Sequence, residues 1–82
     1  MTELEKTLYD LVLPIVDDAN AVSVKSMPSL NENEVVLYVY AKNDDVARLI
    51  GRQGSMATAL RHMMSIASRL EDKKITIKFE SY

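Results

Sequence analysis

The chain has 82 residues, of which 48% are hydrophobic and 27% are charged, and it carries a net charge of −2 and no cysteine. This length predicts one domain spanning residues 1–82, and the composition is that of a folded chain rather than of a disordered segment. The lack of cysteine excludes disulfide scaffolds, thiolate metal sites and cysteine nucleophiles. Because so short a domain buries only about 60% of the surface of its unfolded chain, we expect self-association to add stability.

The N-terminal residues are acidic where an export signal is basic, and the apolar run at residues 11–16 contains Pro14. No stretch approaches the roughly 20 consecutive apolar residues that a membrane-spanning helix needs. The sequence therefore predicts a soluble, cytoplasmic protein that does not enter a membrane.

Charge is distributed unevenly along the chain. Residues 1–45 contain three basic and nine acidic residues, a net charge of −6, whereas residues 46–82 contain seven basic and three acidic residues, a net charge of +4. Residues 46–70 contain four arginines and His62 and no acidic residue. We therefore expect an anionic ligand to bind this segment.

The first predicted element is an amphipathic helix. Thr2 and Glu5 have the spacing of a capping box. Apolar side chains then follow at helical intervals, at Leu4, Leu8, Leu11, Val12 and Ile15. The pattern predicts a helix that continues to about Asp17, with a kink or an earlier end at Pro14, which lacks a backbone N–H.

Two strands are predicted next. Residues 21–27 alternate apolar and polar side chains, which predicts a short, half-buried strand. Residues 28–33 have turn composition, and residues 34–42 are rich in the β-branched and aromatic side chains that strands favour. We expect the two strands to form a hairpin.

Two helices follow the hairpin. Asn43 and Asp44 are suited to cap a short helix over residues 45–50, and a longer helix is predicted over residues 55–70. Polar side chains form a narrow stripe on the longer helix, at Thr58, Arg61, His62, Ser65, Ser68 and Arg69. Apolar side chains occupy more of that helix than one sheet face requires, especially at Met56, Ala59, Met63 and Ile66, which indicates a partner surface or a fuller core.

Residues 73–82 alternate again and predict a final strand with one buried face. The order of elements is therefore α-β-β-α-α-β. It predicts a two-layer α+β fold, in which the helices pack on one face of a three-stranded mixed sheet.

The segment from Gly51 to Gly54 is the one motif with a chemical rationale. Glycine allows positive φ and leaves room for a phosphodiester backbone to approach the loop. The helix that starts at Ser55 offers free N–H groups and a positive dipole end to phosphate. Arg52 adds a bidentate charged contact and Gln53 a neutral hydrogen-bonding group. The alternative is a helix C-cap glycine followed by an ordinary turn.

Residues 46–54 read Val-Ala-Arg-Leu-Ile-Gly-Arg-Gln-Gly and are followed by Ala57, Leu60 and Arg61. This Gly-x-x-Gly segment between two helices, together with the element order and the chain length, resembles a KH domain in its bacterial type II arrangement. The whole chain resembles the small stand-alone KH proteins of the KhpA family.

The resemblance implies single-stranded RNA as ligand, clamped by the loop against an apolar groove. It also implies a homodimer, a heterodimer with a larger KH protein of the KhpB (Jag/EloR) type, and a role as RNA chaperone or post-transcriptional regulator linked to cell elongation and division. The predicted RNA contacts are Gly51, Arg52, Gln53, Gly54, Ser55, Arg48, Ile50 and Arg61. The predicted groove wall comprises Val46, Ile50, Ala57 and strand residues near Leu37 and Val39.

Several of these residues have a second interpretation. Arg48 and Arg61 are equally suited to be solvated charges on a helix face, and Arg69 near a helix end favours that interpretation. Ile50, Ala57 and Leu60 suit the core as well as a groove floor. Tyr38 and Tyr40 are spaced to share one face of a strand, where they form either a base-stacking platform or an ordinary partly covered surface.

Four positions depart from the family pattern. Ser55 and Thr58 stand where basic residues are common, so two potential phosphate contacts are missing. Ala47 and Ala57 replace a frequent glycine and a larger branched residue, which changes the width of the groove. The missing basic residues and the net negative charge favour a second function, that of a protein-interaction scaffold with weak or no RNA binding.

An enzyme is the least favoured class. His62 is the only histidine, and no nucleophile, base or metal-ligand spacing accompanies it. The sequence therefore predicts no catalytic residue, no metal and no cofactor.

Overall fold

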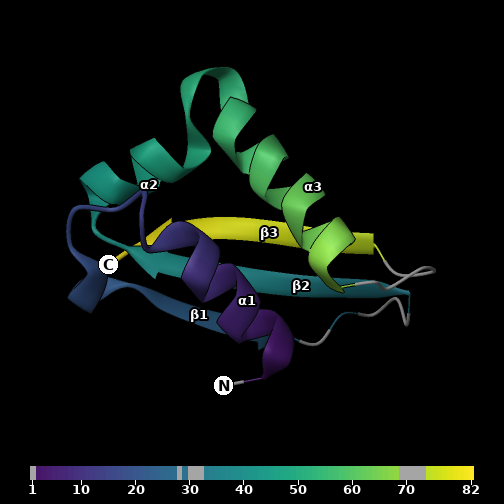
Figure 1. Cartoon of the computed structure of the whole chain (residues 1–82). Coiled ribbons are helices and arrows are strands. Elements are labelled where there is room, and N and C mark those ends of the chain that lie inside the picture. The colour runs from purple at the N-terminus through teal and green to yellow at the C-terminus, as the bar shows by residue number, and fades with distance from the viewer. Residues whose placement is uncertain (1, 28, 30–32, 69–73) are drawn as a thin grey trace.

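The computed structural model describes residues 2–27, 29, 33–68 and 74–82. Three helices lie over one face of a three-stranded sheet (Figure 1). The elements are α1 (Glu3–Val12), the 3-10 turn η1 (Ala19–Ala21), β1 (Ser23–Met27), β2 (Glu34–Ala41), α2 (Asn43–Ile50), the 3-10 turn η2 (Arg52–Gly54), α3 (Ser55–Ser68) and β3 (Lys74–Ser81). This arrangement confirms the predicted α+β fold.

β2 is the central strand of the sheet. It pairs antiparallel with β1, which confirms the predicted hairpin, and parallel with β3, so the sheet is mixed. The register places Val24 opposite Val39 and Ile77 opposite Leu37. Leu37 and Val39 are fully buried, because the helices cover this face of the central strand.

The core lies between the sheet and the helices, and every helix contributes to it. Leu8 and Val12 come from α1, Leu49 from α2, and Leu60 and Met64 from α3. All five side chains are 0% exposed. Complete burial of such a side chain stabilises a fold by about 1.5–3 kcal/mol, so these contacts fix the helices to the sheet.

α1 begins as predicted and ends early. The side chain of Thr2 accepts the N–H of Glu5, and the Glu5 carboxylate accepts the N–H of Thr2, which completes the capping box. The helix ends at Val12 rather than near Asp17. Pro14 has no N–H to continue the helical hydrogen bonds, which explains the early end.

The start of α2 corrects the sequence prediction. The helix begins at Asn43 with Lys42 at the N-cap position, and no side chain caps it. Asn43 and Asp44 therefore lie within the first turn rather than before it. Asp44 and Asp45 place negative charge at the positive end of the helix dipole, which stabilises this terminus.

The other boundaries that lie within the described residues agree with the prediction within two residues. β1 starts at Ser23 rather than at residue 21 because η1 occupies Ala19–Ala21. The predicted end of the long helix at residues 69–70, including Arg69, and the start of the last strand at residue 73 lie outside the described residues.

Candidate nucleic-acid interface

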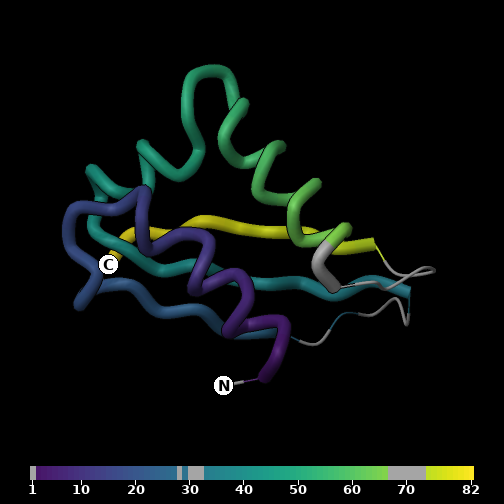
Figure 2. Tube along the Cα trace, viewed as in Figure 1, coloured from purple at the N-terminus to yellow at the C-terminus, as the bar shows by residue number. Residues whose placement is uncertain are grey.

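The turn between α2 and α3 has an unusual backbone. Gly51 has φ 75° and ψ 177°, Gln53 has φ 55° and ψ 27°, and Gly54 has φ 77°. Side-chain-bearing residues essentially never adopt the conformation of Gly51. Gln53 is the only residue other than glycine with positive φ in the described part of the chain. Figure 2 shows the turn as the tip of the α2–α3 hairpin, farthest from the sheet.

Backbone hydrogen bonds within the turn and to the end of α2 hold its conformation. The N–H of Gly51 donates to the carbonyl of Ala47 at 3.0 Å, which ends α2. The N–H of Gly54 donates to the carbonyl of Gly51 at 3.3 Å, and the N–H of Ser55 donates to the carbonyl of Arg52. The turn is thus ordered by its own backbone, and α3 starts directly from it.

The two glycines serve different purposes. A Cβ at Gly51 would lie 2.7 Å from Cβ of Met56 and 2.9 Å from its backbone nitrogen. Gly51 is therefore required for close packing of the turn against the first turn of α3. A Cβ at Gly54 would meet no atom within 4 Å, so this glycine leaves an open surface beside the loop.

Arg52 and Gln53 are exposed between these glycines. Within the described part of the chain, neither side chain takes part in a hydrogen bond or ion pair. Their donors are therefore available to a ligand. Ser55 is also exposed and stands at the first position of α3.

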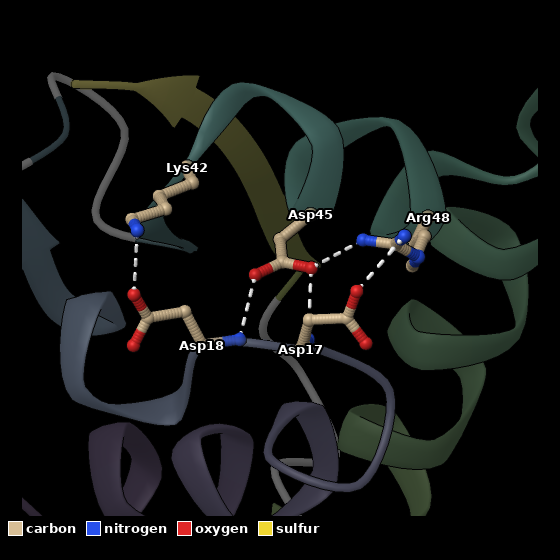
Figure 3. Close-up of polar contacts among 5 residues, drawn as sticks. All are labelled: Asp17, Asp18, Lys42, Asp45 and Arg48. Atoms are coloured by element: carbon tan, nitrogen blue, oxygen red, sulfur yellow. Dashed lines mark hydrogen bonds and ion pairs between the residues drawn. The ribbon is translucent and has the colours of Figure 1, made fainter.

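Arg48 has a different environment from Arg52. Its Nη1 lies 2.7 Å from Oδ1 of Asp45, and its Nη2 lies 3.0 Å from Oδ2 of Asp17 (Figure 3). The guanidinium thus joins α2 to the segment that follows α1. A role for Arg48 as an RNA contact stays a prediction, and these two ion pairs favour a structural role.

Asp45 is the centre of this cluster and is only 2% exposed. Its two carboxylate oxygens accept the backbone N–H groups of Asp17 at 2.9 Å and of Asp18 at 3.1 Å (Figure 3). These hydrogen bonds, above all the one from Asp17, together with Arg48, hold the pKa of Asp45 below its ordinary value of 3.8. Lys42 pairs with Asp18 at 2.8 Å beside it.

Arg61 lies in a hollow between α3 and β3. The hollow is lined by Ala57, Thr58 and Arg61 from α3 and by Ile77 from β3. Arg61 is exposed, and its side chain makes no ion pair within the described residues. The structure therefore distinguishes Arg61, which is free to meet an anion, from Arg48, which is already paired.

The strand side of the hollow is formed by Ile77. Leu37 and Val39 themselves are fully buried under the helices. Ile77, which the register places opposite Leu37, lines the hollow because β3 is the edge strand nearest to it. The groove wall near Leu37 and Val39 stays a prediction. Val46 is half-buried, and Ile50 is 38% exposed at the end of α2. The alternation of residues 73–82 marked Ile77 as apolar, but the order of strands in the sheet was not visible in the sequence.

The geometry of this surface agrees with comparisons to known proteins. Residues 5–79 match the family described as KhpA/KhpB, KH domain. The chain belongs to this family. The KhpA/KhpB match runs from within α1 to within β3 and includes the Gly51–Gly54 turn.

Curated relatives support the same assignment. "RNA-binding protein KhpA" of Clostridium perfringens (strain 13 / Type A) is 30% identical over 74 residues, which cover 89% of this chain and 96% of the relative. The protein of that name from Listeria monocytogenes serovar 1/2a is 27% identical over 75 residues, which cover 92% of this chain and 96% of the relative. The protein from Caldanaerobacter subterraneus subsp. tengcongensis is 27% identical over 78 residues, which cover 95% of this chain and 97% of the relative.

No group of three or more histidine, cysteine or acidic side chains in the described residues is arranged to hold a metal ion. No helix in that part of the chain has the length and apolar character needed to cross a membrane. His62 is exposed on α3.

Proposed function

We propose that this chain is a non-enzymatic protein that binds single-stranded RNA through the Gly51–Gly54 turn. The observation that carries the proposal is the pair of exposed side chains, Arg52 and Gln53, held without partners among the described residues between two positive-φ glycines at the start of α3. The curated KhpA relatives are named as RNA-binding proteins, which supports the same function.

The turn offers phosphate two kinds of contact. The guanidinium of Arg52 forms charge-assisted hydrogen bonds to phosphate oxygens, and the dipole of α3 adds positive potential at the same place. The hollow with Ala57 and Ile77 then receives bases against an apolar surface, and Arg61 provides a cation at its rim. Such a turn clamps about four nucleotides in KH domains generally.

The proposal extends to assembly and cellular role. We propose a homodimer, a heterodimer with a KhpB (Jag/EloR)-type KH protein, and a cytoplasmic role as RNA chaperone or regulator linked to cell elongation and division. Two apolar side chains on α3 support a protein partner, since Met63 is 40% exposed and Ile66 is 77% exposed. These side chains lie away from the Gly51–Gly54 turn along α3, so one molecule has room for both partners.

RNA binding is tested by fluorescence anisotropy of a labelled single-stranded RNA at several salt concentrations. We expect the variant Arg52→Asp/Gln53→Asp to bind at least about tenfold more weakly than the wild type and with a shallower salt dependence. The matched control is Lys6→Asp/Asn20→Asp, which changes the net charge equally at two exposed positions outside the α2–α3 hairpin. Equal binding by the folded loop variant and the control would contradict the proposal.

The exposed side chains on α3 also favour a second candidate function, that of a protein-interaction scaffold. Ile66→Glu places a charge in the proposed partner surface and should shift sedimentation toward the monomer without unfolding the chain. If the loop variant retains all biological activity while Ile66→Glu abolishes it, the scaffold function replaces RNA binding. Loss of activity in the loop variant with the dimer intact supports RNA binding.

A further inference from the structure

The face of the sheet opposite the helices carries a row of three aromatic rings. The ring centroids of Tyr38 and Tyr40 are 6.1 Å apart, with an angle of 18° between the ring planes. Those of Tyr40 and Tyr82 are 6.2 Å apart, with an angle of 33°. We call Tyr38, Tyr40 and Tyr82 the tyrosine row. None of the three helices covers this face (Figure 1).

The backbone fixes the position of the tyrosine row. Tyr38 and Tyr40 lie two residues apart on the central strand, so their side chains emerge from the same face. The N–H of Tyr82 donates to the carbonyl of Ala41 at 3.3 Å, which holds the last residue beside the end of β2. Tyr82 is 73% exposed, and Tyr38 and Tyr40 are half-buried. The row is therefore a preformed, partly exposed aromatic surface.

Basic side chains flank the row. The register places Lys25 of β1 and Lys78 of β3 on either side of Tyr38. Both lysines are exposed and lie on the same face as the rings. Lys74 is exposed on this face as well, opposite Glu34. The Glu34 carboxylate accepts hydrogen bonds from the hydroxyl groups of Ser29 and Thr76, which stabilise its negative charge.

We propose that this uncovered sheet face is a second contact surface for single-stranded nucleic acid. Bases stack on the tyrosine row, and phosphates bind Lys25 and Lys78. Stacking of bases on aromatic rings beside a basic track is a general mode of single-strand binding. The proposal shares its ligand class with the proposed function, and it concerns residues on the opposite side of the sheet from the Gly51–Gly54 turn.

The two surfaces are continuous around the edge of the sheet. β3 is an edge strand, and successive side chains of a strand point to opposite faces. Ile77 lines the hollow on the helix side, and its neighbour Lys78 lies on the uncovered face next to Tyr38. A single-stranded nucleic acid that leaves the hollow therefore reaches the tyrosine row by passing over β3 alone.

Charge favours nucleic acid over a protein partner on this face. Lysine and glutamate are depleted from the centres of protein interfaces, whereas Lys25 and Lys78 flank the middle of this sheet face and Glu80 lies opposite Tyr40. On β1 and β2, Met27 is the large apolar residue that is exposed, with 38% of its surface accessible to solvent.

Anisotropy with two RNA lengths separates the two surfaces. The short probe has about four nucleotides, enough for the turn, and the long probe has roughly four times that length. We expect Tyr38→Thr/Tyr40→Thr to weaken binding of the long probe by about tenfold or more and to leave the short probe unchanged, because each stacked base contributes about 1–3 kcal/mol. Threonine keeps strand propensity, and circular dichroism confirms folding.

A second pair of variants leaves the rings intact. If Lys25 and Lys78 each bind one phosphate, Lys25→Gln/Lys78→Gln should reduce the salt slope of long-probe binding by about 1.4, since each contact to a single strand contributes about 0.7. Lys6→Gln on α1 is the control and should leave the slope unchanged. Glu80→Gln should strengthen binding by removing a negative charge opposite Tyr40.

Photo-crosslinking identifies the contact directly. The long RNA carries 5-iodouridine, and mass spectrometry locates the linked residues. Cross-links at the tyrosine row support the proposal. It is overturned if the sheet-face variants bind the long probe as the wild type does, if the wild type binds neither probe, or if Tyr38→Thr/Tyr40→Thr dissociates a dimer in sedimentation. Loss of binding in the sheet-face variants, with the loop variant unaffected, would instead overturn only the role of the Gly51–Gly54 turn.

Discussion

The guanidinium of Arg48 lies 2.7 Å from the carboxylate of Asp45, three residues earlier on α2. Asp45 is buried and also accepts two backbone N–H groups from the segment after α1. The pair therefore ties the start of α2 to the chain that crosses from the first helix to β1. The position of the α2–α3 hairpin, and hence of the proposed RNA-binding turn, depends on this cluster.

Substitution of Asp45 should destabilise the fold more than substitution of Arg48. Asp45→Asn replaces one acceptor oxygen with an NH₂ donor that faces an existing donor, whereas Arg48→Gln leaves the carboxylate with two backbone hydrogen bonds. We expect the melting temperature to fall in the order wild type, Arg48→Gln, Asp45→Asn, as measured by circular dichroism. An Asp45→Asn variant as stable as the wild type would show that the cluster contributes nothing.

Acid should weaken the fold through Glu5. Its carboxylate accepts the N–H of Thr2 at 2.7 Å and of Ser26 at 2.8 Å, and these hydrogen bonds lower its pKa from 4.5 to about 2. Because folding favours the ionised form, the contribution is complete above pH 4.5 and is lost as the pH falls through about 2. Glu5→Gln should therefore lower the free energy of unfolding at pH 7. It should also reduce the decline of that free energy between pH 4.5 and about 2, as measured by urea unfolding.

The control for Glu5 is Asp10→Asn, an exposed acid on the same helix. It should leave the stability at neutral pH close to that of the wild type. A Glu5→Gln variant whose stability declines with acid as steeply as that of the wild type would exclude the hydrogen bonds to Thr2 and Ser26 as the cause.

The two glycines of the turn should respond differently to alanine. Gly51→Ala combines a disfavoured φ of 75° with contacts of 2.7 and 2.9 Å to Met56, and should cost about 2 kcal/mol or more of unfolding free energy. Gly54→Ala meets open space and should cost about 1 kcal/mol from its φ alone. Urea unfolding measures the free energy of unfolding of both variants. Equal losses would show that Met56 moves aside to accommodate the new Cβ without cost.

Two residues on opposite sides of α3 provide a further test. Leu60→Ala removes a fully buried side chain and should cost about 2–5 kcal/mol. Ile66→Ala changes a side chain that is 77% exposed, and should alter the unfolding free energy of the monomer by less than about 0.5 kcal/mol. A concentration-dependent loss of stability in Ile66→Ala would indicate that Ile66 lies in a dimer interface.

Local patterns were sufficient to predict the elements of this fold. The capping box at Thr2, the proline at position 14, the alternation of the strands and the two glycines of the turn each act over a few residues. Such features depend on neighbours in sequence, so the order α-β-β-α-α-β and the Gly51–Gly54 motif were visible before any coordinates.

The roles of individual arginines required the tertiary structure. Arg48 and Arg61 were equivalent candidates in the sequence, because both lie on predicted helices in an acid-free segment. Arg48 pairs with Asp45 on its own helix and also with Asp17, which the fold brings from 31 positions earlier, whereas Arg61 opens onto the hollow beside Ile77. No local pattern reports a contact over that separation.

Short-range propensity and hydrophobic period were thus enough to predict the elements, the α+β class and the turn. Which strand is central and which lies at the edge depends instead on how the whole chain packs. That order buries Leu37 and Val39, exposes Ile77 to the hollow, and brings Tyr82 beside Tyr40. Pairing between distant strands is set by packing of the whole chain, which is why it was not readable from any one segment.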